Sequence, residues 1–94
     1  VDLRTVKPLD VSLILASVGK TGRAVIVDSG WKTCGLAAEV AALIAENGLV
    51  RSGTSIRRVT LPDIPAPASR SLEKGYYIDA RKIADAVLGN DFRK

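Results

Sequence analysis

The stretch RAVIVDSGWKTCGLAAEVAALIAENG, residues 23–48, decides the fold. It opens on Arg23–Asp28, whose four consecutive apolar residues are typical of a strand covered on both faces of a parallel sheet. After the loop Ser29–Gly35, apolar residues recur from Leu36 at the spacing of one helical face, and Asn47-Gly48 supplies a stop signal. The stretch therefore predicts a central buried strand that leads through a loop into a helix.

The residues before this stretch add a strand and a helix. Val1–Arg4 alternates between apolar and polar residues, which predicts a short strand. Apolar residues then recur at i, i+3, i+4 and i+7 over Val11–Val18, which predicts a helix. Asp10 is placed to accept hydrogen bonds from the first free amides, and we expect Gly19 to be the left-handed residue that ends the helix.

The residues after the stretch add a further strand and helix. Ile56, Val59 and Leu61 predict a strand over Ser55–Leu61. Three prolines between positions 62 and 67 then exclude regular structure there. Asp79 as the cap, apolar residues on one side of Ala80–Leu88, and Gly89-Asn90 as the stop predict a last helix. Strands that alternate with helices predict one α/β domain over residues 1–94.

Composition excludes several classes of protein. With 94 residues, 47% of them hydrophobic and 26% charged, the chain fits one globular domain and is too apolar for a disordered tail. No apolar run approaches the roughly 18 residues of a membrane span. The net charge is +4, but the basic residues are dispersed and the aromatic residues are few. We therefore expect neither a membrane nor a nucleic acid as partner.

The chain has no histidine and a single cysteine, Cys34. The missing histidine excludes Ser–His and Cys–His pairs, histidine metal ligands and imidazole acid–base chemistry. We therefore expect no catalytic, cofactor-binding or metal-binding residue here, and we interpret Cys34 as a small residue that fills a turn. A chain without methionine also suggests a piece of a longer polypeptide, with a free-standing domain as the alternative.

The loop Ser29–Gly35 is the most informative local feature. It follows a buried strand and enters a helix, at the edge where open α/β sheets place ligands. Amides near Gly35, together with Lys32, could hold a carboxylate or a phosphate. Trp31 is the only tryptophan, a residue type favoured at interface hot spots. In the simpler interpretation, Trp31 covers the edge of the core and Lys32 is only solvated.

The whole chain resembles a known family through a series of short blocks. These blocks are Val1–Thr5, Pro8–Asp10, Ser17–Arg23, Val25–Trp31, Gly35, Ala38–Ala42, Arg58–Thr60, Pro62-Asp63, Pro65 and Leu72-Glu73. In order and spacing they resemble the carboxyl-terminal domain of transketolase-like thiamine diphosphate enzymes. The likeness is greatest to β subunits of the decarboxylating component of 2-oxoacid dehydrogenase complexes. Pro67-Ala68 departs from the family, which usually has Pro-Tyr, Pro-Phe or Pro-Thr there.

The resemblance implies a fold with more strands than the pattern of this chain predicts. It implies a three-layer α/β/α sandwich around a mixed, mostly parallel sheet of about five strands. Tyr76–Ile78 is the candidate for a short extra strand.

The resemblance also implies a function without catalysis. It implies an assembly and partner-docking domain in a β subunit whose parent enzyme decarboxylates a 2-oxoacid and reductively acylates lipoyl groups. Thiamine diphosphate and Mg²⁺ belong to other domains of that parent. The implied partners are neighbouring domains, the α and β subunits, and the small binding domain of the acyltransferase. The single cysteine excludes an internal disulfide and so indicates a reducing compartment, which we expect to be the cytoplasm, or the mitochondrial matrix in a eukaryote.

Five residues are candidates for partner binding. They are Trp31, Lys32, Arg58, Asp63 and Glu73. The two carboxylates are included because the docking modules of such complexes resemble basic domains, and charge complementarity sets association rate and register. Two alternatives stay open. One is the same domain from a transketolase or a deoxyxylulose-phosphate synthase, and the other is a free-standing regulatory module that binds an anion at Ser29–Gly35.

Overall fold

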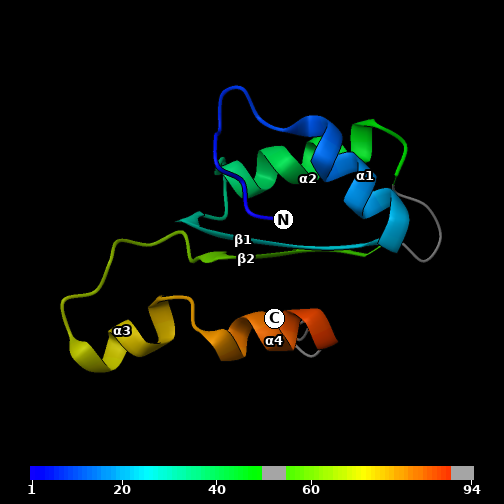
Figure 1. Cartoon of the computed structure of the whole chain (residues 1–94). Helices are drawn as coiled ribbons and strands as arrows, with labels where there is room; N and C mark the ends of the chain where they lie inside the picture. The colour runs from blue at the N-terminus through cyan, green and yellow to red at the C-terminus, as the bar shows by residue number, and fades with distance from the viewer. Residues whose placement is uncertain (50–54, 90–94) are drawn as a thin grey trace.

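The computed structural model describes residues 1–49 and 55–89. In chain order the elements are α1 (Val11–Thr21), β1 (Arg23–Trp31), α2 (Leu36–Glu46), β2 (Ser55–Leu61), α3 (Arg70–Tyr76) and α4 (Ala80–Leu88). Strands β1 and β2 form a parallel sheet, with α1 and α2 on one face and α4 on the other (Figure 1). The predicted α/β class is confirmed. Within the described ranges the sheet has two strands, fewer than the five that the resemblance implies.

Two predicted strands are wrong. Val1–Arg4 forms no ladder: Leu3 packs against the core, but Val1 is exposed and the side chains of Asp2 and Arg4 pair with each other at 3.2 Å. Alternation of apolar and polar residues alone does not make a strand, because a strand also needs a neighbouring strand in hydrogen-bonding register. At the other candidate, Tyr76–Ile78, the chain is helical at Tyr76, which is the last residue of α3.

Helix α1 begins as predicted and ends three residues later than predicted. The carboxylate of Asp10 accepts a hydrogen bond from the amide of Leu13 at 3.2 Å, so the predicted cap is confirmed. Gly19 lies inside the helix. Gly22 instead adopts the left-handed conformation, with φ 72°, and its amide donates to the carbonyl of Val18 at 2.7 Å. The helix therefore continues for another turn, and the chain reverses directly into β1.

The main core lies between α1, α2 and the sheet. It is formed by Ile14 and Val18 of α1 and by Val40 and Ile44 of α2, all less than 8% exposed. Partly buried residues pack around it; they are Leu3, Leu9, Ala24, Ile26, Leu36, Leu43, Leu49 and Ile56. Full burial of such a side chain contributes about 1.5–3 kcal/mol, so this layer holds most of the apolar stabilisation.

The second layer covers the other face of the sheet. Asp79 caps α4 by accepting from the amide of Lys82 at 2.9 Å, and Gly89 ends it with φ 79°, both as predicted. Between β2 and α3 the proline-rich segment 62–69 is irregular, as expected. Helix α3 itself is an addition to the predicted layout. The predicted stop residue Asn90 lies outside the described residues.

Candidate functional site

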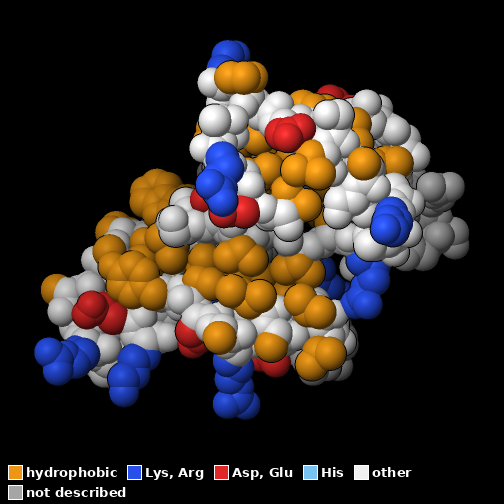
Figure 2. Space-filling view, viewed as in Figure 1, with side chains coloured by type: hydrophobic (Ala, Val, Ile, Leu, Met, Phe, Trp, Pro, Cys, Tyr) orange, Lys and Arg blue, Asp and Glu red, His pale blue; other side chains and the backbone are white. Residues whose placement is uncertain are grey.

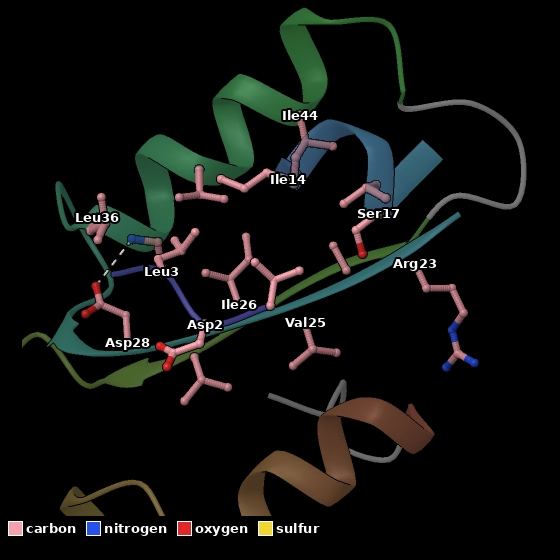
Figure 3. Close-up of a pocket in the computed structure, with 16 residues that line it drawn as sticks. Asp2, Leu3, Ile14, Ser17, Arg23, Val25, Ile26, Asp28, Leu36 and Ile44 are labelled. Carbon is pink, nitrogen blue, oxygen red and sulfur yellow. Dashed lines mark hydrogen bonds between the residues drawn. The ribbon is translucent and has the colours of Figure 1, made fainter. Parts of the chain in front are cut away.

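An irregularity in β1 shapes the carboxyl end of the sheet. Val27 pairs with Val59 and Trp31 pairs with Leu61, so three residues of β1 face a single residue of β2. Such a bulge redirects side chains. Here it lets the carboxylate of Asp28 accept from the amide of Gly30 at 3.1 Å and from the amide of Ala37, in the first turn of α2, at 3.3 Å. The second of these bonds is the dashed line in Figure 3.

Asp28 therefore takes the place that an anion would occupy. The Ala37 amide at the amino end of α2 already donates to this carboxylate, and a second anion would meet its negative charge. This contact disfavours the interpretation of Ser29–Gly35 as a phosphate or carboxylate site. Within that segment, residues 29–31 belong to β1, and only Lys32–Gly35 forms a turn.

Gly35 is required at the end of this turn by close packing. A Cβ atom added to Gly35 would lie 2.2 Å from the carbonyl oxygen of Trp31. No side chain fits that space without a shift of the backbone. Cys34 precedes it with φ 60° and is exposed. The turn is thus tightly joined to the last residue of β1.

Four of the five predicted docking residues meet at this end of the sheet. Trp31 ends β1 and is 51% exposed. The backbone carbonyl of Lys32 accepts from Nη1 of Arg58 at 2.7 Å. Asp63 follows β2, and its Oδ1 accepts from the amide of Thr33 at 3.1 Å while its Oδ2 accepts from the Thr33 hydroxyl. These hydrogen bonds lower the pKa of Asp63, with a smaller contribution from Lys32, so its carboxylate remains charged.

Glu73 lies elsewhere. It is half-buried in the first turn of α3, where its backbone carbonyl accepts from the amide of Tyr77 at 3.1 Å. Within the described part of the chain, no hydrogen bond or ion pair joins it to the four residues at the sheet end. The structure therefore does not bring the two predicted carboxylates together.

The sequence reasoning missed an apolar extension of this site. Ile64 and Tyr77 are 53% and 47% exposed, about as much as Trp31. Tyr76 connects them, because its hydroxyl donates to the carbonyl of Ile64 at 3.1 Å and its ring meets that of Tyr77 edge-on at 4.9 Å. Figure 2 shows apolar side chains gathered on this face over the sheet and over α3 and α4. We call Trp31, Ile64 and Tyr77 together the exposed apolar residues.

Thr33 was also missed as a member of the site. The available signal was topological: Thr33 lies in the loop that follows the first predicted strand, Arg23–Asp28, and Asp63 comes two residues after the second, Ser55–Leu61. Carboxyl ends of parallel neighbours meet at one edge, so the two residues belong together.

A groove of about 410 Å³ lies along β1 on the side of the main core. The segment Val1–Leu3 borders it, and Leu3, Ile14, Ile26 and Ile44 point into it (Figure 3). Its lining is mostly aliphatic. In the described ranges, no group of three or more Asp, Glu or Cys side chains could hold a metal ion, and no helix is long and apolar enough to cross a membrane.

Comparison with known protein families shows to which family the chain belongs. Residues 1–83 match the family model described as transketolase, C-terminal domain. The chain belongs to this family. Within the transketolase C-terminal domain family, the predicted likeness to β subunits of 2-oxoacid dehydrogenases is also confirmed by individual relatives.

Three curated relatives are similar over most of the chain. The pyruvate dehydrogenase E1 component subunit beta of Bacillus subtilis is 45% identical over 71 residues, which are 76% of this chain and 22% of the relative. The acetoin:2,6-dichlorophenolindophenol oxidoreductase subunit beta of Cupriavidus necator is 40% identical over 93% of this chain and 26% of its own. The 2-oxoisovalerate dehydrogenase subunit beta of Bacillus subtilis is 39% identical, with coverages of 93% and 27%. The chain thus spans about a quarter of these relatives' length.

Proposed function

We propose that this chain is the non-catalytic assembly and partner-docking domain of a 2-oxoacid dehydrogenase β subunit. The family and the named β subunits support the assignment. The observation that carries it is the exposure of these apolar residues: Trp31, Ile64 and Tyr77 each expose about half of their surface. Tryptophan and tyrosine are the residue types that most often dominate binding energy in protein interfaces.

In this proposal, the chemistry belongs to other domains of the parent enzyme. Those domains bind thiamine diphosphate and Mg²⁺ and decarboxylate the 2-oxoacid, and the enzyme works in the cytoplasm or the mitochondrial matrix. We also propose that the parent's sheet has about five strands. This is supported because, within the described ranges, β1 pairs with β2 along one edge only, which leaves its other edge available to further strands.

The proposed partners are the neighbouring domains, the α and β subunits, and the small binding domain of the acyltransferase. Trp31 supplies an apolar anchor, and the exposed ammonium group of Lys32 lies next to it in sequence. Arg58 acts from β2 through the carbonyl of Lys32. Glu73, on α3, is proposed as a separate acidic contact for a basic partner surface.

Replacement of Trp31 by alanine in the polypeptide that carries this chain tests the proposal. We expect at least a tenfold loss of affinity for the α subunit or for an isolated acyltransferase binding domain, measured by titration calorimetry, because central tryptophans contribute about 2 kcal/mol or more. Leu13→Ala is the matched control, since Leu13 is 47% exposed on α1, away from the sheet end. Equal, wild-type affinities for both partners in both variants would contradict the docking function.

A further inference from the structure

We propose that Asp63 is a positioning residue: with Arg58 it fastens the turn Lys32–Gly35 to the end of β2 and so fixes how Trp31 is presented to a partner. The inference rests on the proposed docking function. It gives Asp63 a role different from direct contact with a basic partner.

The carboxylate of Asp63 is used inside the chain. One oxygen accepts from the amide of Thr33 at 3.1 Å, and the other accepts from the hydroxyl of the same residue. These bonds join residues 30 positions apart. A carboxylate that accepts two hydrogen bonds from one residue holds that residue in position and orientation. It also has less capacity left for a partner's guanidinium or ammonium groups.

Arg58 provides the second attachment. Its Nη1 donates to the carbonyl of Lys32 at 2.7 Å, across 26 positions. Lys32 and Thr33 are consecutive, so two neighbouring residues of the turn are held by two side chains from β2 and its continuation. At the far end of the turn, Gly35 packs against the carbonyl of Trp31. The position of Trp31 is therefore restrained both by the bonds to the residues that follow it and by the close packing of Gly35 on its carbonyl.

These bonds matter because the turn has little else to hold it. Lys32, Thr33, Cys34 and Asp63 are all exposed, so burial contributes little to their order. If the bonds of Asp63 were lost, the turn would sample more conformations, and a partner would have to order it on binding. A preorganised aromatic anchor binds more tightly than a mobile one with the same contacts.

The hydroxyl of Thr33 allows a test in which Asp63 is unchanged. We expect Thr33→Val to weaken binding of an isolated acyltransferase binding domain about as much as Asp63→Ala, by roughly tenfold. Thr33→Ser restores the hydroxyl and should restore the affinity. Glu46→Ala, at the far end of α2, removes the same charge from an exposed site and should bind like wild type. If Asp63→Ala weakens binding but Thr33→Val does not, Asp63 is a direct contact and the proposal is wrong.

Hydrogen exchange separates this inference from the docking function itself. In the intact polypeptide without a partner, we expect the Thr33 amide to exchange at least tenfold faster in Asp63→Ala than in wild type or Glu46→Ala. Unchanged exchange would overturn the positioning role even if binding were lost. If the wild type binds neither the α subunit nor the acyltransferase binding domain, the docking function fails, and exchange alone decides whether Asp63 holds the turn.

Discussion

Helices α1 and α2 cover one face of the two strands, and the second layer, in which α4 contacts the sheet and α3 precedes it, covers the other by different means. The first buries a continuous cluster of aliphatic side chains, with Ile44 only 1% exposed. The second buries Ala86 and Tyr76 but leaves Val87 44% and Leu88 70% exposed. Helix α4 therefore presents much of its apolar side to solvent, whereas in α1 and α2 Leu13 is the one large apolar side chain exposed to a similar degree.

Polar attachments hold much of the second layer. Nη2 of Arg23 donates to the carbonyl of Val87 at 2.6 Å, and Nζ of Lys82 donates to the carbonyls of Gly75 and Tyr77 at 2.9 and 2.7 Å. A hydrogen bond contributes about 0.5–1.5 kcal/mol net, less than a buried Leu or Ile side chain. The comparison teaches that α1 and α2 bury their apolar residues within the chain, while α4 leaves apolar surface exposed, as the proposed docking function requires.

Truncation of one side chain in each layer should give the largest difference in the free energy of unfolding. We expect Ile44→Ala to lower the free energy of unfolding by about 2–5 kcal/mol, because it opens a cavity in the main core. Val87→Ala removes a half-exposed side chain and should change it by less than about 1 kcal/mol. Chemical denaturation followed by circular dichroism measures both. Equal losses of unfolding free energy in the two variants would show that both layers contribute equally to stability, and the contrast between them would be wrong.

The same contrast explains which elements the sequence predicts. Helix α2 follows from regular apolar spacing, since its buried face meets the main core. Strand β2 follows instead from its content of Ile, Val and Leu, because its apolar residues lie on both faces of the sheet. Helix α3 does not, because residues 70–76 have little apolar periodicity and follow three prolines. Its position depends on the Tyr76 hydroxyl and on Lys82, contacts that join segments through side-chain geometry rather than through a repeating pattern.

A glycine substitution tests whether the turn before α2 belongs to the well-packed layer. Gly35→Ala should cost about 1–3 kcal/mol, because its Cβ would lie 2.2 Å from a backbone oxygen and the turn would have to move. Gly19→Ala is the control. Its Cβ would meet only a Leu49 methyl at 3.8 Å, and alanine favours a helix by roughly 0.5–1 kcal/mol. A Gly35→Ala variant as stable as wild type would show that the turn adapts freely.

The sequence predicts part of this arrangement, while partner binding by these residues stays a prediction. Trp31, Lys32 and Asp63 lie at or after the carboxyl ends of adjacent parallel strands, so topology brings them together. Arg58 lies in the middle of β2 and reaches the carbonyl of Lys32 through its side chain. The internal role of Asp63 could not be read in this way. It depends on the orientation of Thr33, which follows from the three residues of β1 that face one residue of β2.

Removal of one helix cap in each layer should sharpen the comparison further. Asp10 caps α1 and Asp79 caps α4, and loss of either bond should cost about 1 kcal/mol. We expect Asp10→Ala to lower the midpoint of global unfolding. Asp79→Ala should instead raise hydrogen exchange of amides in α3 and α4 while the exchange of α2 stays at its wild-type rate. Faster exchange in α2 as well would mean that both layers unfold as one unit.

The smallest effect on stability is expected from protonation of Asp63. The Thr33 hydroxyl and amide, with Lys32 nearby, lower the pKa of this carboxyl below its ordinary value of 3.8. A carboxyl with a lowered pKa in the folded state adds stability above its ordinary pKa, and this contribution is lost as pH falls through the folded value. The Thr33 amide shift, followed by NMR, should therefore titrate with a midpoint below 3.8, and Asp63→Ala should abolish that transition. A midpoint at or above 3.8 would mean that Thr33 does not hold the charged carboxylate, and the end of the sheet would then lack the polar attachment inferred for it.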